Sequence, residues 1–176
     1  MDEPIARIIG IDPGSRTTGF GIIDVRRGQA SHVHSGNIQL LSESLTERLG
    51  EIFRRISELV GEYRPGEMAI ERVFMARNPD SALKLGQARG AAICGAVNAS
   101  LPVAEYSPRE IKQAIVGRGG AAKEQVQHMV KVLLNLRVEL RSDQADALAV
   151  ALCHCHVRET LRRIPAAERV QGGRLR

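Results

Sequence analysis

The chain has 176 residues, of which 43% are hydrophobic and 26% charged, and its formal net charge is +5. This size and composition are typical of one globular domain that buries a core without disulfide staples. Three cysteines form no regular framework and no signal-peptide pattern opens the chain, so we expect a cytoplasmic protein with free thiols. The longest apolar run, residues 147–153, is too short for a transmembrane helix, and no membrane association is expected.

The charges are segregated along the chain. Residues 1–71 contain 11 acidic and 8 basic side chains, whereas residues 72–131 contain 4 acidic and 9 basic ones. Residues 157–176 hold 2 acidic and 6 basic side chains. A polyanion bound by the basic middle segment, beside carboxylates that bind cations, would explain this distribution. Solvated helix faces would explain it equally well.

The first half of the chain predicts a meander of strands followed by a helix and another strand. Apolar runs bounded by turn residues predict strands, in chain order, at residues 5–11, 19–25 and 30–40. Apolar side chains then recur at helical spacing from Leu45 to Leu59, and Arg-Pro-Gly at 64–66 ends that helix. The short run 68–70 predicts a strand that leads to Glu71.

The second half predicts mainly helices. Asn78 and Pro79 open a long helix, rich in small residues, that reaches about residue 99. A strand at 102–106 and a short helix capped by Ser107 are predicted next, followed by a flexible loop at 117–120. Two more helices follow. One is predicted at 126–133, and the other is capped by Ser142 and reaches about residue 164. This order predicts an α/β architecture with a mixed sheet. We expect a single domain, residues 1–164, and a flexible basic tail, residues 165–176.

Four carboxylates are candidates for a cation site. Asp12 and Glu71 end apolar runs, and Asp143 and Asp146 are three positions apart on one helix. A turn explains Asp12 and the helix dipole explains the helical pair, but a glutamate at a strand end has no ordinary structural role. If the four converge, two unit charges 4 Å apart repel by about 4 kcal/mol at an effective dielectric constant of 20. A cation site is therefore favoured over a stabilising role.

The ligand chemistry indicates which cation. Hard oxygen donors without a contributing cysteine favour Mg²⁺ or Mn²⁺, and four carboxylates suit two ions. The run Cys153-His154-Cys155-His156 suggests zinc at first sight, but on a helix alternate residues point to different faces, so we do not expect a zinc site there.

Four segments resemble the RuvC family of bacterial Holliday junction resolvases. They are GIDPGSRTTGFGI (10–22), AIERVFMARNPDSALKLGQARG (69–90), SPREIKQAIVGRGGAAKEQVQHMV (107–130) and SDQADALAVALCHCHV (142–157). The match runs in order from about residue 8 to residue 157. It implies an RNase H-like fold, with a mixed five-stranded sheet and helices on both faces, in which the four acids meet.

The resemblance also implies a function. Members of the family cut four-way junctions symmetrically by metal-dependent phosphodiester hydrolysis, during homologous recombination and DNA repair. On this basis the expected catalytic metal ligands, for two Mg²⁺ ions that Mn²⁺ can replace, are Asp12, Glu71, Asp143 and Asp146. Lys112 and Lys123 fall on basic positions near the scissile phosphate, and the expected DNA contacts are Phe74, Arg77, Lys84 and Arg118. The implied partners are a second copy, through the helix at 80–99, and the branch-migration proteins RuvA and RuvB.

Two other functions are compatible with parts of the sequence. Residues 10–22 also resemble the first phosphate loop of actin-like ATPases and sugar kinases, although a second phosphate loop and an adenosine motif are not evident. A junction-binding module without catalysis would need only the basic segment. The glycine-rich stretch 117–123 lacks the Gly-Lys-Ser/Thr ending of a phosphate loop, and we expect a flexible basic loop beside DNA.

Overall fold

One mixed sheet organises the protein, for which a computed structural model describes residues 5–73 and 78–163. The strand order is β3-β2-β1-β4-β5. The strands are β1 (Ala6–Asp12), β2 (Thr17–Arg26), β3 (Gln29–Gln39), β4 (Glu67–Glu71) and β5 (Val103–Tyr106). β2 runs antiparallel to its neighbours β1 and β3, whereas β4 is parallel to both β1 and β5. The predicted mixed five-stranded sheet is confirmed, and β1 is its central strand.

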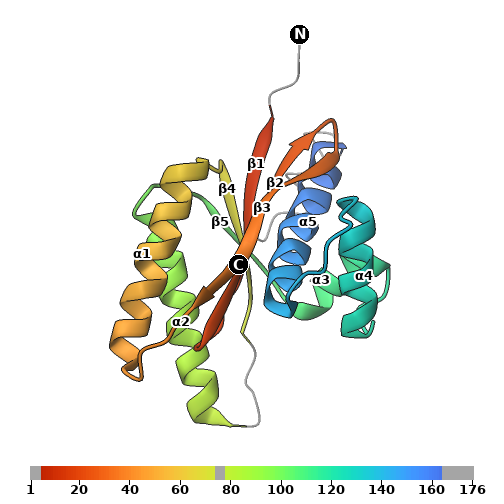
Figure 1. Cartoon of the computed structure of the whole chain (residues 1–176). Helices are drawn as coiled ribbons and strands as arrows, with labels where there is room; N and C mark the ends of the chain where they lie inside the picture. The colour runs from red at the N-terminus through yellow and green to blue at the C-terminus, as the bar shows by residue number, and fades with distance from the viewer. Residues whose placement is uncertain (1–4, 74–77, 164–176) are drawn as a thin grey trace, which may run out of the picture.

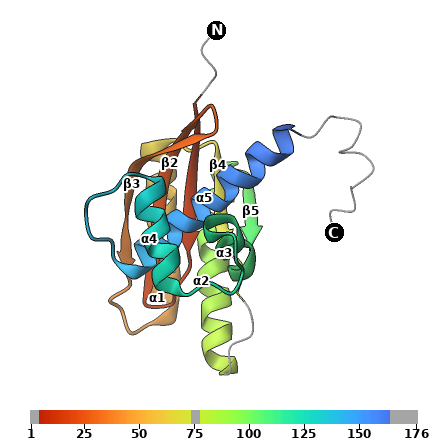
Figure 2. The ribbon, with the colours of Figure 1, turned by 90° about the vertical axis from the view of Figure 1, so that its right-hand side faces the viewer.

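Helices cover both faces of this sheet, as predicted (Figure 1). One face is covered by α1 (Leu45–Tyr63) and α2 (Pro79–Val97), and the other by α3 (Pro108–Val116), α4 (Lys123–Leu133) and α5 (Ser142–Arg163). Figure 2 shows α5 crossing the sheet behind α4 and α3. α5 packs on β1 and β2, and α3 and α4 pack on α5. In the described part of the chain, no helix has the length and apolarity to cross a membrane.

Two hydrophobic cores follow from the alternation of side chains along β1. Ile8 belongs to the core beneath α5, whereas Ile9 and Ile11 belong to the core beneath α1 and α2. All three are fully buried. Successive residues of a strand point to opposite faces, so an apolar run of this kind is expected of a strand covered on both sides.

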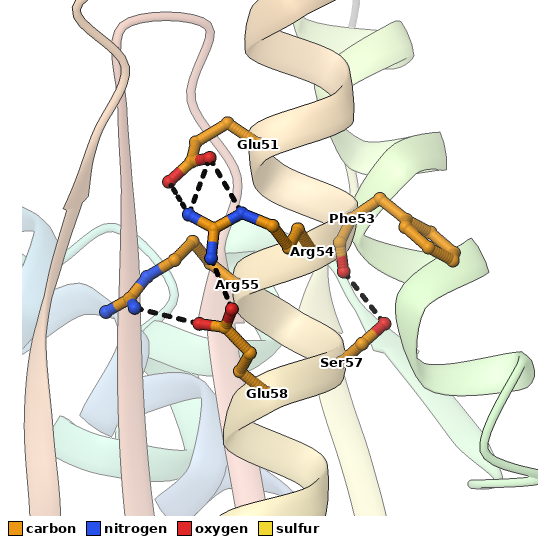
Figure 3. Close-up of polar contacts among 6 residues, drawn as sticks. All are labelled: Glu51, Phe53, Arg54, Arg55, Ser57 and Glu58. Atoms are coloured by element: carbon orange, nitrogen blue, oxygen red, sulfur yellow. Dashed lines mark hydrogen bonds and ion pairs between the residues drawn. The ribbon is translucent and has the colours of Figure 1, made fainter.

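The outer face of α1 is charged and lies in solvent. Arg54 forms ion pairs with Glu51, at 2.6 Å, and with Glu58, and Arg55 also pairs with Glu58, at 2.9 Å (Figure 3). Such exposed pairs contribute only about 0.2–1 kcal/mol each. They mark the solvated side of an amphipathic helix whose opposite side buries Ile52 and Ile56.

Most helix ends match the sequence signals, and one differs. Asn78 caps α2 with Pro79 in its first turn, and Ser107 forms a capping box with Glu110 at the start of α3. Ser142 is the first residue of α5 rather than its cap, and its hydroxyl accepts a hydrogen bond from Gln127. A serine can satisfy a neighbouring side chain instead of the helix end, and the sequence does not reveal which it does. The predicted tail, 165–176, lies outside the described residues.

The absence of a side chain at Gly10 sets the distance between α5 and the sheet. A Cβ atom there would lie 2.2 Å from the carbonyl oxygen of Ala147 and 2.6 Å from the backbone nitrogen of Ala151. The backbones of β1 and α5 therefore touch, and any larger residue would push the helix away.

We expect Gly10→Ala to lower the free energy of unfolding by about 1–3 kcal/mol, the range for overpacked cores. Gly50→Ala is the matched control, because Gly50 is exposed on α1 and an added Cβ meets nothing within 4 Å. That substitution should be neutral or stabilise by up to about 1 kcal/mol. Urea denaturation measures both, and equal stability of Gly10→Ala and the unchanged protein would contradict the close contact.

Candidate metal centre

Two of the four candidate carboxylates lie side by side at one edge of the sheet. Asp12 and Glu71 are the last residues of β1 and β4. These strands are parallel, and Ile11 pairs with Ile70, so the next residue of each strand reaches the same edge. Asp12 and Glu71 point to the face that α5 covers, because Ile11 and Ile70 belong to the opposite core.

The other two carboxylates come from the first turns of α5. Asp143 approaches β2 at Gly19, which pairs with Asp12. A Cβ atom at Gly19 would lie 2.0 Å from the carbonyl oxygen of Asp143. Only a residue without a side chain lets the start of α5 lie this close to the sheet. Asp146, one turn further along, has a side chain that is 19% exposed.

The four candidate carboxylates lie close together in the structure. Carboxylate oxygens of Asp12, Asp143 and Asp146 lie within 4.8 Å of one another. Glu71 is not a member of that group, but together with Asp146 it lines an adjoining cavity of about 180 Å³. Two members of the group of three, Asp12 and Asp146, are therefore also neighbours of Glu71.

Without a bound cation, burial and mutual repulsion disfavour the ionised form of these carboxylates. Burial, followed by the charges of Glu71, Asp146 and Asp143, raises the pKa of Asp12 to about 8. Burial, followed by the charge of Asp146, raises the pKa of Glu71 to about 7. Burial also raises the pKa of Asp146, against the hydrogen bond and charge of Lys123. A divalent cation would reverse these shifts, because it stabilises the ionised form.

Two lysines line the same cavity. Lys123, at the start of α4, places its Nζ atom 2.5 Å from Oδ2 of Asp146. Burial lowers the pKa of Lys123, but its hydrogen bond to Asp146 and the nearby acids more than offset this, so that the pKa is raised. Lys112, on α3, also lines the cavity. Both predicted catalytic lysines therefore lie beside the acidic cluster.

Of the four predicted DNA contacts, the structure describes Arg118 and Lys84, and neither lines the cavity beside the acids. Arg118 is exposed in the loop between α3 and α4 and lines a separate hollow. Lys84 is on α2, on the opposite face of the sheet from α5, and pairs with Asp80 at 2.6 Å. Phe74 and Arg77 lie outside the described residues. For these four residues a role in DNA binding stays a prediction.

The acid cluster, and not the size of a cavity, identifies the site. A hollow of about 630 Å³ lies between α3 and the second half of α5, but none of the four carboxylates lines it. The sequence run that resembled a zinc motif lies on α5 as well. Within it, His154 bonds Tyr106 at 2.7 Å and Glu67 at 2.6 Å, in a network that contains none of the four acids.

Two residues near the acids were not predicted from the sequence. Gly19 allows the approach of Asp143, and Asn37 on β3 donates a hydrogen bond from Nδ2 to Oδ2 of Asp143 at 3.5 Å. Asparagine is uncommon inside strands, and this was the one signal in the sequence that could have indicated Asn37. The significance of Gly19 depends on contact with a helix more than 120 residues away, about which a strand pattern says nothing.

Comparisons with known proteins agree on one family. The family model described as "Crossover junction endodeoxyribonuclease RuvC" matches residues 8–154. Proteins with that name from Tolumonas auensis and Aeromonas hydrophila are 56% and 59% identical over 172 and 154 residues. These matches cover 96% and 88% of this chain, and 98% and 89% of the relatives.

A solved structure described as Thermus thermophilus RuvC in complex with Holliday junction substrate agrees with the fold. It is 37% identical, has a TM-score of 0.82, and aligns over 88% of this chain and 96% of its own. The family model covers most of the described residues, including all four carboxylates and both lysines. The chain belongs to the RuvC family of crossover junction endodeoxyribonucleases.

Proposed function

We propose that this protein is a structure-selective endonuclease that resolves Holliday junctions by symmetric, metal-dependent phosphodiester hydrolysis, in homologous recombination and DNA repair. The observation that carries the proposal is the meeting of Asp12, Asp143 and Asp146 beside Glu71 in a chain of the RuvC family. The RuvC family model matches residues 8–154, whereas the resemblance to ATPases is confined to residues 10–22, so the nuclease is the better supported function.

The residues present fit a hard divalent cation. The cluster offers carboxylate oxygens with no sulfur or nitrogen donor, which is the chemistry that Mg²⁺ and Mn²⁺ prefer. We propose Mg²⁺, which Mn²⁺ can replace, with two ions in each site. Asp12, Asp143 and Asp146 would hold one ion, and Asp12 with Glu71 the other. The raised pKa values of Asp12 and Glu71 support this, since two uncompensated charges would otherwise share one buried edge.

Two bound ions would activate water and stabilise the leaving 3′ oxygen of an in-line displacement. Two lysine side chains of the protein would contact the phosphate. Lys112 and Lys123, on α3 and α4, present ammonium groups to a phosphate that enters the cavity beside Glu71. A fixed positive charge there stabilises the negative charge that develops on the phosphate. The walls of α3 and α4 thereby orient the strand to be cut.

We further propose a homodimer that acts in the cytoplasm with RuvA and RuvB as partners. A two-fold dimer would present equal sites to two opposed strands of a four-way junction. The helix proposed for the contact, α2, exposes Leu83 to 69% and Val97 to 57%. These exposed apolar side chains, on a helix that also packs against the core, support a contact there.

The carboxylates should be essential for cutting and dispensable for binding. Asp146→Asn and Glu71→Gln each remove a ligand charge, and we expect cleavage of a synthetic four-way junction in Mg²⁺ to slow by at least about 100-fold. Loss of even an outer-shell partner of a metal commonly costs 10–100-fold. Junction binding, measured by gel mobility shift without metal, should persist.

Glu51→Gln is the matched control, because Glu51 lies on the solvated face of α1 (Figure 3). It should cleave at the unchanged rate. Cleavage by either site variant at that same rate would disprove the carboxylate mechanism. A protein that binds junctions but cuts them in neither Mg²⁺ nor Mn²⁺ would instead be a junction-binding module without catalysis.

The metal-free protein should lose stability as the pH rises. The folded-state pKa values of Asp12 and Glu71, about 8 and 7, exceed the unfolded values of 3.8 and 4.5. The folded state therefore keeps protons that the unfolded chain releases, and the free energy of unfolding falls between about pH 4 and pH 8. Thermal unfolding in EDTA should show this fall. Mn²⁺ should oppose it and therefore raise Tm more at pH 8 than at pH 6.

Asp12→Asn separates this effect from the titration of other groups. The variant removes the most perturbed carboxylate, so its Tm in EDTA should fall less with pH, and its response to Mn²⁺ should be weak. Identical pH profiles for the variant and the unchanged protein would contradict the repulsion within the cluster.

A further inference from the structure

Strand β3 contributes none of the four carboxylates, yet two of its side chains bond to the first turn of α5. Asn37 Nδ2 donates to Asp143 Oδ2 at 3.5 Å, and Gln144 Nε2 donates to Ser35 Oγ at 2.8 Å. Ser35 is in turn bonded to Nε2 of His32 at 2.7 Å. The strand therefore holds two consecutive residues of the helix, one of which is a candidate metal ligand.

Strand register explains why Asn37 can reach the site. Asn37 pairs with Gly19 on β2, and Gly19 pairs with Asp12 on β1. Because Gly19 has no side chain, the space between Asn37 and Asp12 is filled by Asp143. The carboxylate of Asp143 is thus flanked by the amide of Asn37 on one side and by the partly buried Asp12 on the other.

The orientation of the amide is set by its neighbour. Nδ2 faces the carboxylate of Asp143, whereas the reverse assignment would place two oxygens against each other. Oδ1 of Asn37 is buried and has no hydrogen-bond partner among the described residues. An unpaired buried acceptor is destabilising, and such groups in native folds often serve a functional site.

We propose that Asn37 is a positioning residue for the metal centre. It keeps the carboxylate of Asp143 turned toward Asp12 and Asp146. Partners that orient metal ligands tune metal affinity. This inference rests on the proposed function, since it requires that the cluster binds a divalent cation.

Asn37→Leu tests the inference, because leucine keeps a similar volume and removes both the donor and the acceptor. The readout is the Mn²⁺ concentration at the midpoint of thermal stabilisation, measured on the full chain without DNA. We expect the midpoint to rise by about 10-fold, within the range for outer-shell partners of metals. Tm in EDTA should not fall, because an unpaired acceptor is lost, and cleavage should recover toward the original rate at saturating Mn²⁺.

Gln29→Leu is the matched control, since it removes an exposed amide at the far end of the same strand. Its midpoint should not change. If Asn37→Leu does not fold, Asn37→Ala decides the question: a raised midpoint supports the role of Asn37, and an unchanged one overturns it.

Each result separates this inference from the proposed function. If the unchanged protein is not stabilised by Mn²⁺ and does not cut junctions, the proposed function is wrong. If it responds to Mn²⁺ and Asn37→Leu has the same midpoint, only the inference is wrong. A lower Tm in EDTA with an unchanged midpoint would show a purely structural role for Asn37 and would also overturn it.

Discussion

Repulsion among partly buried carboxylates at one edge of the sheet is the constraint on which the rest of the structure depends. Two unit charges 4 Å apart repel by about 4 kcal/mol at an effective dielectric constant of 20. Three carboxylates have oxygens within 4.8 Å of one another, and burial raises the pKa of the central one, Asp12, to about 8. Such an arrangement persists only if the surrounding fold is rigid enough to hold it.

The fold supplies that rigidity through contacts that contain no charge. β1 is the central strand and is buried on both faces, so Asp12 is fixed by the best packed part of the sheet. Gly10 and Gly19 let the backbone of α5 touch the sheet and carry Asp143 to it. Lys123 partly compensates the cluster from α4. A single close helix contact thus couples the stability of the core to the geometry of the site.

The sequence predicts much of this architecture for identifiable physical reasons. Apolar runs and turn residues located all five strands, because a strand covered on both faces must be apolar throughout. Asn78 and Ser107 cap their helices as predicted, whereas Ser142 begins α5 without capping it, because its hydroxyl bonds Gln127 across the fold. The meeting of the four acids followed from the family resemblance and not from their spacing. Gly19 and Asn37 escaped prediction, since their importance depends on long-range contacts with Asp143.

Anomalous diffraction from a crystal soaked in Mn²⁺ would show whether these carboxylates bind divalent cations together. We expect a manganese ion that shares oxygens of Asp12, Asp143 and Asp146, at distances of about 2.1 Å, near the values for hard divalent ions. An active protein whose manganese lies elsewhere, or whose four carboxylates bind none, would contradict it.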